Sequence, residues 1–321
     1  MKKIYLYSIL AICILGLLPF NGFAQSRKYI SQFSHFQNYY NPGLTGYEGS
    51  TARGFVRNQW AGFEGAPKTV FVSAEFDFAE MGKSSDPALL GKNAAGLSVL
   101  HDQYGPFQET EIIASYASRI RISSSTNLRL GAGVNYNTVR LDGSRLSTEQ
   151  LNDPTTGQYY NNFANMNVLD FNIGLAITHA NYYLSYGAHN VNKGALSSGD
   201  VFMERKPTVS ILQAGYRQAL SADLAVIANF MYRSQEDLPD NTEFNVKALL
   251  MDKLWIGAGH RVNYANNFQL GFLLNKMSIG YVYETPMNRS YLLPNTTHEF
   301  LASFRLFRTN QRTHSKEVLI W

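Results

Sequence analysis

The sequence predicts an all-β fold, a transmembrane antiparallel β-barrel of about 14 strands with a short N-terminal segment at its periplasmic mouth or in its lumen. No apolar run after Ala24 approaches the ~20 residues of a membrane helix. A secretory signal at the N-terminus directs the chain out of the cytoplasm. The third observation is a two-residue alternation that places apolar side chains on one face of each expected strand, as in Leu169, Phe171, Ile173, Leu175 and Ile177.

Residues 1–24 have the composition of a cleavable signal peptide. Lys2 and Lys3 form its positive region, an apolar stretch follows, and Ala24 is a small residue that signal peptidase accepts. We expect cleavage after Ala24, with a retained membrane anchor as the alternative. The single cysteine, Cys13, lies inside this segment, so the mature chain is expected to have no thiol. The formal net charge of the mature chain becomes 28 − 2 − 24 = +2, which gives no reason to expect a nucleic-acid partner.

The composition agrees with a sheet in a membrane. Charged residues make up only 16% of the chain, below the roughly 25% that is usual in soluble domains, whereas aromatic residues make up 13%. Lipid cannot satisfy the N–H and C=O groups of an open sheet edge, so a sheet in a membrane has to close into a barrel. The cell outer membrane is therefore the expected location, and its lipid an expected partner.

Period-two segments divide residues 51–307 into the strands of this barrel. Counting them gives fourteen candidates, an even number, as in bacterial barrels. A barrel of this size should admit either a narrow pore or an inserted segment. The candidate strands lie near residues 51–59, 68–77, 94–104, 108–120, 127–139, 168–178, 181–189, 207–219, 222–232, 241–250, 253–262, 266–274, 276–284 and 297–307. In the strand at 127–139, the residues expected to face the lumen are Arg129, Gly131, Gly133, Asn135 and Asn137.

The connections suggest which end of the barrel faces the periplasm. Such barrels have short periplasmic turns and longer external loops, and the sequence fits this pattern when both termini are periplasmic. Two connections break the pattern, because the outer turn at Gly105-Pro106 is short and the inner segment 78–93 is long. Segment 78–93 is either a docking surface or a plain linker. The expected outer loops are 140–167, 190–206, 233–240 and 285–296.

The N-terminal segment, residues 25–50, does not alternate. Phe33, Phe36 and Tyr40 recur at helical spacing, and Asn41-Pro42 stops a helix. We expect a short amphipathic element that plugs the barrel, with a mobile leader as the alternative.

The C-terminal tail, residues 308–321, is first basic and then apolar. One interpretation is a disordered periplasmic extension. The other is that Val318-Leu319-Ile320-Trp321 docks as a strand or anchors at the membrane interface.

Three stretches of the sequence form a recognisable signature. They are Gln32-Phe33-Ser34 through Tyr40-Asn41-Pro42, then Arg57-Asn58-Gln59-Trp60-Ala61-Gly62-Phe63-Glu64-Gly65-Ala66-Pro67-Lys68-Thr69, and finally Thr297-His298-Glu299. In this order they resemble the PorP/SprF family of outer-membrane proteins associated with type IX secretion, over nearly the whole mature chain. The sequence departs from the family pattern after Pro42, at His260 and in the tail, which leaves the subgroup open. A short chain without an extra periplasmic domain looks more SprF-like than PorP-like.

The resemblance implies a non-enzymatic barrel that partners an exported surface protein of the adhesin or gliding type. It would support the export of that protein or its attachment at the cell surface, with type IX secretion components as further partners. The alternative is a passive channel or a small-ligand outer-membrane transporter. The positions carried over as partner-binding or motif residues are Asn41, Pro42, Arg57, Asn58, Gln59, Trp60, Gly62, Phe63, Pro67, His298 and Glu299.

Two interpretations of the Arg57–Thr69 motif remain open. In the functional one, the loop after Trp60 folds over the barrel mouth and meets an exported partner. In the structural one, Arg57 pairs with acids in the lumen and Trp60 anchors the rim. His298 and Glu299 are neighbours on a strand and point to opposite faces, so they do not bind one metal together. We therefore expect no catalytic, cofactor or metal site.

Overall fold

The computed structural model describes residues 30–84, 90–146, 157, 159, 162–200, 206–236, 238–287, 296–307 and 320–321. The expected signal peptide, residues 1–24, and most of the tail, residues 308–319, lie outside the described residues. Within the described ranges, no helix is both long enough and apolar enough to cross a membrane.

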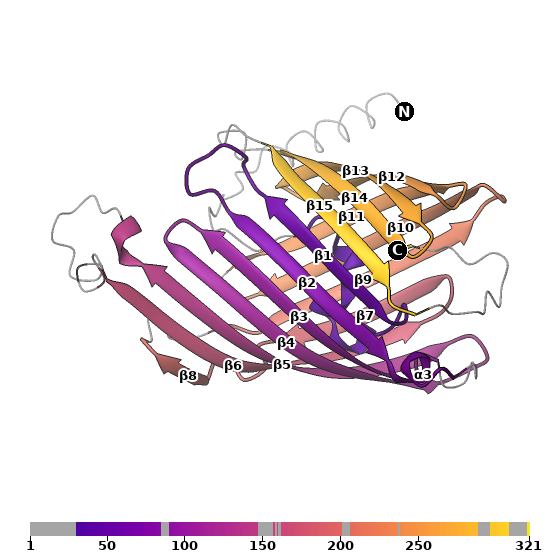
Figure 1. Ribbon diagram of the computed structural model, residues 1–321, viewed down its shortest axis with the longest axis horizontal. Coiled ribbons are helices and arrows are strands. Elements are labelled where there is room, and N and C mark those ends of the chain that lie inside the picture. The colour runs from indigo at the N-terminus through magenta and orange to yellow at the C-terminus, as the bar shows by residue number, and fades with distance from the viewer. Residues whose placement is uncertain are drawn as a thin grey trace, which may run out of the picture.

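The wall of the molecule is a closed antiparallel barrel of fourteen strands (Figure 1). β1 pairs with β15 as well as with β2, so the ring of fourteen strands is closed. A fifteenth strand, β8 (Leu196–Gly199), pairs beside the wall with part of β6. The fourteen predicted strands are all present. Their bounds are β1 Thr51–Asn58, β2 Lys68–Asp77, β3 Asn93–Tyr104, β4 Phe107–Arg121, β5 Asn127–Asp142, β6 Phe163–Thr178, β7 Tyr182–His189, β9 Val209–Ala219, β10 Leu224–Gln235, β11 Leu238–Leu250, β12 Leu254–Arg261, β13 Ala265–Leu274, β14 Met277–Pro286 and β15 Thr297–Arg305.

Side chains alternate across this wall as the sequence predicts. In β5, Leu130, Val134 and Tyr136 point outward and are exposed, whereas Arg129 and Asn137 are buried toward the lumen. The same alternation runs through β6, where the five apolar residues from Leu169 to Ile177 share the outer face. Because the hydrocarbon core of a membrane stabilises such an apolar belt, the barrel surface is suited to lipid.

The two ends of the barrel differ in their connections. At the end that we call the short-turn end, tight turns such as 179–181, 251–253 and 275–276 join the strands, and the longer segment after β2 contains the helix α3 (Phe78–Met81). At the opposite end, called the long-loop end, the connections include residues 59–67 and the segment between β5 and β6.

One of the expected outer loops is wrong. Residues 233–240 are mostly strand, because β10 continues to Gln235 and β11 begins at Leu238. The Tyr232 hydroxyl donates a hydrogen bond to Asp240 (2.6 Å) across this hairpin. The polar composition of the segment reflects strands that continue past the apolar belt, which periodicity alone does not separate from a loop.

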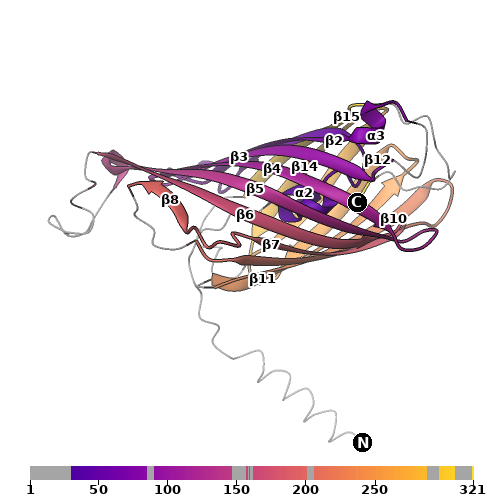
Figure 2. The ribbon, with the colours of Figure 1, turned by 90° about the horizontal axis from the view of Figure 1, so that it is seen from below.

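Residues 30–50 lie inside the barrel and are called the plug below. They form three single turns, η1 (Phe33–His35), α2 (Gln37–Tyr40) and η2 (Pro42–Leu44), and Figure 2 shows α2 enclosed by the strands. The prediction of an inserted N-terminal segment is confirmed. The expected amphipathic character of this element is wrong, because every residue from Ile30 to Thr45 is buried and none faces solvent.

The plug runs along the lumen and carries much of its apolar core. Ser31 lies in the long-loop half beside Arg57, whereas Ser50 lies at the short-turn end where β1 begins. Between them, the ring of Phe36 packs edge-on against Phe55 (4.9 Å between centroids) and Phe71 (5.4 Å). Such aromatic pairs add to the stabilisation that burial itself provides.

The last two residues of the chain also lie in the lumen. Ile320 is 4% exposed and Trp321 1% exposed. The two residues lie in no strand and are buried, whereas the two interpretations of the tail as a whole, residues 308–321, stay predictions. The described part of the tail is a second inserted element, packed against the plug.

Candidate functional site: the plug and its anchors in the lumen

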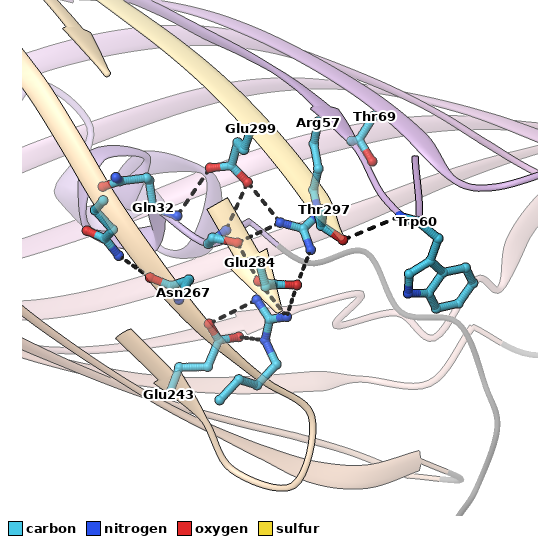
Figure 3. A network of polar contacts seen from close by, with 12 residues as sticks. Gln32, Arg57, Trp60, Thr69, Glu243, Asn267, Glu284, Thr297 and Glu299 are labelled. Atoms are coloured by element: carbon cyan, nitrogen blue, oxygen red, sulfur yellow. Dashed lines mark hydrogen bonds and ion pairs between the residues drawn. The ribbon is translucent and has the colours of Figure 1, made fainter. Parts of the chain in front are cut away.

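Arg57 connects the plug to the seam of the barrel, which is the place where the first strand, β1, pairs with the last, β15. Its side chain points from β1 into the lumen and is 1% exposed. One terminal nitrogen donates to Glu299 Oε2 (3.1 Å) and to Ser31 Oγ (2.6 Å), and the other donates to Glu284 Oε1 (2.8 Å). Arg57 lies directly opposite Glu299 in the β1–β15 ladder, so the pair sits where the first and last strands close the barrel (Figure 3).

Glu284 is shared by two arginines. Arg261 on β12 donates to both Glu284 oxygens (3.3 and 3.2 Å) and makes two hydrogen bonds to Glu243 on β11 (2.9 and 3.3 Å). The β11–β12 register places Glu243 directly opposite Arg261. We call Arg57, Arg261, Glu243, Glu284 and Glu299 the seam cluster. None of its members is more than 5% exposed.

The plug supplies hydrogen bonds that the carboxylates of the seam cluster require. The Ser31 N–H donates to Glu299 (3.1 Å), and so does the Gln32 N–H (3.3 Å). The Ser31 hydroxyl donates to Glu284 (2.7 Å). Burying charged groups is costly unless their hydrogen-bonding capacity is satisfied. This end of the plug therefore completes a polar network in addition to filling space.

The middle of the plug lies on a strip of three glycines. Gly131, Gly174 and Gly187 face the lumen side by side on β5, β6 and β7. A Cβ atom on Gly131 would lie 2.3 Å from the carbonyl carbon of Pro42, and one on Gly174 would lie 1.9 Å from Asn41 Oδ1. Only the absence of a side chain allows the plug backbone to approach the wall so closely.

Asn41 and Arg129 fix the turn that rests on this strip. Asn41 Oδ1 accepts from the Gly43 N–H (2.8 Å), and its amide donates to the Leu175 carbonyl oxygen (3.0 Å). Arg129, 2% exposed, donates to the carbonyl oxygens of Gly43 (2.9 Å) and Thr45 (2.7 Å). A guanidinium that binds carbonyl groups holds the backbone of the plug without depending on its side chains.

Trp321 packs against the short-turn side of the plug. Its ring stacks on Tyr47 (5.9 Å), meets the edge of Tyr183 (4.8 Å) and lies under the guanidinium of Arg217 (4.0 Å). Its main-chain oxygen accepts from Lys247 Nζ (2.8 Å) and from the Ser34 hydroxyl (3.0 Å). Trp321 thus ties the plug to three strands of the wall.

Residues 59–67, called the rim loop, are fixed at the long-loop end. The N–H groups of Trp60 and Ala61 donate to Thr297 Oγ1 (3.4 Å) and to the Thr296 carbonyl (3.0 Å), beside β15. The Gly105 N–H of the β3–β4 turn donates to Gly65 (3.0 Å) on the other side. This rim loop presents Phe63, which is 49% exposed, on a hydrogen-bonded backbone.

The structure brings only some of the predicted site residues together. Arg57 and Glu299 meet although 242 residues separate them, as the structural interpretation of the motif requires. Asn58 and His298 lie opposite each other on the outer face of the same strands. His298 bonds there to the Tyr281 hydroxyl (2.6 Å) and not to the lumen. The remaining residues lie in two separate regions: Asn41 and Pro42 in the plug, and Gln59, Trp60, Gly62, Phe63 and Pro67 in the rim loop.

Four luminal residues of the site were not among those predicted from the sequence. Glu243, Glu284 and Arg261 complete the seam cluster, and Lys247 binds Trp321. The signal that could have found them is a charged residue at a luminal position of a predicted strand. Within the described part of the chain, no group of three or more His, Cys, Asp or Glu side chains is placed to hold a metal ion.

A comparison with models of protein families matches residues 22–304 to the family described as type IX secretion system membrane protein PorP/SprF. The chain belongs to the PorP/SprF family. Its barrel is therefore of the outer-membrane type and is associated with type IX secretion. The match covers the plug, the rim loop and the seam of this PorP/SprF-family barrel, and it does not separate the two subgroups. No curated protein matches the chain.

Solved structures that the chain matches include a transporter, a FadL homologue and a porin. The Pseudomonas putida toluene transporter TodX has a TM-score of 0.48 and 9% identity, with 87% of this chain and 94% of that chain covered. A Pseudomonas aeruginosa FadL homologue has a TM-score of 0.41 and 9% identity over 80% and 89% of the two chains. The KdgM porin has a TM-score of 0.37 and 8% identity over 79% and 98%. At these identities the likeness concerns the fold alone.

Proposed function

We propose that this PorP/SprF-family barrel partners an exported surface protein of the adhesin or gliding type, and supports its export or its attachment at the cell surface. In the proposed orientation, the short-turn end faces the periplasm and the long-loop end faces outward, as in other outer-membrane barrels. Type IX secretion components are proposed as further partners.

The plug is the observation that carries this proposal. A passive channel needs a path through the lumen, whereas here residues 30–45 are buried inside the barrel. The seam cluster, Arg129 and Trp321 fix this segment at three levels. A barrel occupied in this way is better suited to hold a partner than to pass a solute.

The rim loop is a suitable surface for such a partner. Its backbone is held on both sides by hydrogen bonds, and it presents Phe63 to solvent. Exposed aromatic side chains contribute strongly to protein interfaces, and a loop that is already ordered loses little conformational entropy on binding. We therefore assign the partner contact to the rim loop and its neighbours at the long-loop end.

Purification of the tagged barrel from the outer membrane of the producing bacterium tests the proposal. We expect an exported surface protein to co-purify with the wild-type barrel. The amount that co-purifies should fall at least tenfold with Phe63→Asp. Met251→Asp is the matched control, because Met251 is an exposed apolar residue (70%) in a turn at the opposite end. It should retain the partner. All three barrels should give a folded band in mild detergent that shifts on boiling.

Two results would overturn the proposal. The first is that no surface protein or secretion component co-purifies while liposomes that contain the barrel show solute-selective flux, which would establish the channel alternative. The second concerns orientation: an external protease that cleaves a site inserted in the turn 251–253 but spares one in the rim loop would reverse the proposed topology.

A further inference from the structure

We propose that the short-turn end contains a binding site for a small oxyanion of the phosphate class. The site is a cavity of about 60 Å³ between the plug, the seam strands and Ile320. A cavity needs roughly 10–15 Å³ to hold one water molecule, so this space accommodates several waters or one small oxyanion. The proposal is independent of the exported partner.

The strand register assembles the walls of this cavity from two rows of residues. In one row, Ser303 lies opposite Arg53 on one side and opposite Ser278 on the other. In the next row, Arg305 lies opposite Thr51, and its N–H donates to the Lys276 carbonyl (2.8 Å). The closure of β1 onto β15 therefore concentrates hydroxyl and cationic groups at one place on the luminal side of the seam.

The charge of the cavity favours an anion. Three lining side chains are cationic, Arg53, Lys276 and Arg305, and one is anionic, Glu48, which gives 3 − 1 = +2 for the lining. Glu75, which lies 3.8 Å from Arg53, is not part of the lining. Glu48 is itself held by Arg53 (3.0 Å) and by Arg217 (3.7 Å), which reduces its repulsion of a ligand. An oxyanion is bound most strongly where such cations and hydroxyl donors converge.

Arg53 is held in place for this role. Its three nitrogens donate to the Thr51 hydroxyl (3.1 Å), to the His35 carbonyl (2.6 Å) and to Glu48. A guanidinium has five N–H donors, so these three bonds leave two for a ligand.

Two buried polar atoms in the lining lack a hydrogen-bond partner. His35 Nε2 and Ser278 Oγ have none within the described part of the chain, although their residues are only 8% and 7% exposed. Leaving buried polar atoms unpaired is costly, and such atoms commonly bind a water molecule or an ion. An oxyanion that accepts from both groups would satisfy these atoms, and the cations around them favour it electrostatically.

The phosphate group has two available sources. One is the free ion, and the other is the headgroup of a membrane phospholipid. A lipid headgroup can reach the cavity from the outside of the barrel wall. Met277, which lines the cavity at the short-turn end, is also 40% exposed.

Titration calorimetry on the full chain in zwitterionic detergent tests the site, with inorganic phosphate as the probe and chloride at matched ionic strength as the blank. We expect saturable binding that Lys276→Met weakens at least tenfold and that Ser278→Ala weakens severalfold. Lys253→Met is the matched control, because Lys253 occupies a neighbouring turn but does not line the cavity. Phosphate should also change the fluorescence of the wild type, since the Trp255 ring lies 5.4 Å from that of His35.

A second titration with short-chain phosphatidylglycerol separates the two sources. If the lipid headgroup is the ligand, this lipid binds through Lys276 and outcompetes free phosphate, whereas phosphatidylcholine does not. The proposal is overturned if neither phosphate nor the lipid binds saturably. It is also overturned if Lys253→Met weakens binding as much as Lys276→Met, because the binding would then reflect only the general positive charge of this end.

Discussion

The two ends of the plug are held to the barrel by different chemistry. Near the long-loop end, Ser31 and Gln32 bind the carboxylates of the seam cluster, in which every member is charged and buried. Toward the short-turn end, glycines, the carbonyl-binding Arg129 and the ring of Trp321 hold the plug mainly through backbone atoms and aromatic surface. Two buried charged residues that touch the plug there, Arg53 and Glu75, also bind its backbone, at the His35 carbonyl and the Gly46 N–H.

This difference predicts how each end tolerates change. Removing one partner of a buried charged network leaves the others uncompensated, whereas removing an aromatic or backbone contact costs only that contact. The seam cluster therefore couples closure of β1 onto β15 to the position of the plug. The contacts of the short-turn half influence how firmly the plug is held, but they do not determine whether β1 closes onto β15.

The largest expected effect follows from replacing Glu284. Glu284→Leu leaves Arg57 and Arg261 without the carboxylate they share and should reduce the free energy of unfolding by about 3–5 kcal/mol. Urea unfolding of the barrel in lipid vesicles measures this. Glu284→Gln retains an acceptor oxygen and should cost less, and the exposed Glu64→Leu should change stability by less than about 0.5 kcal/mol. Equal stability of the Leu variant and the wild type would show that the cluster does not hold the seam.

A smaller effect, confined to the plug, is expected from the glycine strip. Gly131→Ala places a Cβ against Pro42 and should cost about 1–3 kcal/mol by displacing the plug. Limited proteolysis should then cut between residues 30 and 50 while the barrel keeps its heat-shifted band. Gly133→Ala is the control, because a Cβ there meets only wall atoms, the nearest being the Ala114 carbonyl oxygen at 3.3 Å. Cleavage of both variants at the same rate would contradict the proposed contact.

The wall of the barrel could be derived from sequence to a large extent. Each strand carries its own alternation, so the fourteen strands and the lipid-facing side of β5 follow from local pattern. The pattern fails where strands continue beyond the membrane, as at 233–240, because polar residues there occupy both faces.

The contents of the lumen could be derived only in part. The sequence predicted that Arg57 would pair with an acid in the lumen. It could not predict that the acid is Glu299, because the two residues are 242 positions apart and meet only when β1 pairs with β15. Residues 30–46 of the plug are buried on all sides, so the helical spacing of Phe33, Phe36 and Tyr40 does not separate a buried face from an exposed one. Gly131 and Gly174 look like ordinary small luminal residues until the plug backbone is placed on them. Trp321 finds its partners on β7, β9 and β11, and no local signal in the tail indicates them.

A still smaller effect should follow from removing the ring of Trp321. Trp321→Ala loses the contacts with Tyr183 and Arg217 and should lower the protection of the plug amides by about 1–2 kcal/mol. Hydrogen exchange between Gln32 and Tyr40 measures this, and global unfolding should change less. Trp60→Ala, which alters the same residue type in the rim loop, should leave these amides unchanged. If it accelerates their exchange equally, the effect of Trp321 is not local.

The smallest effect on the free energy of unfolding is expected from replacing Lys206, a charged residue of the long-loop half that is only partly buried. Lys206 lies 3.5 Å from Glu109 and 3.6 Å from Glu111, but its side chain is 23% exposed. Solvent screening limits such a bridge, so Lys206→Met should cost less than about 1 kcal/mol, and the loss should shrink at high salt. The penalty of Glu284→Leu should persist at the same salt, because its partners are buried. Urea unfolding of both variants at low and high salt makes the comparison. A salt-insensitive loss of several kcal/mol for Lys206→Met would show that burial does not decide which charges hold this barrel together.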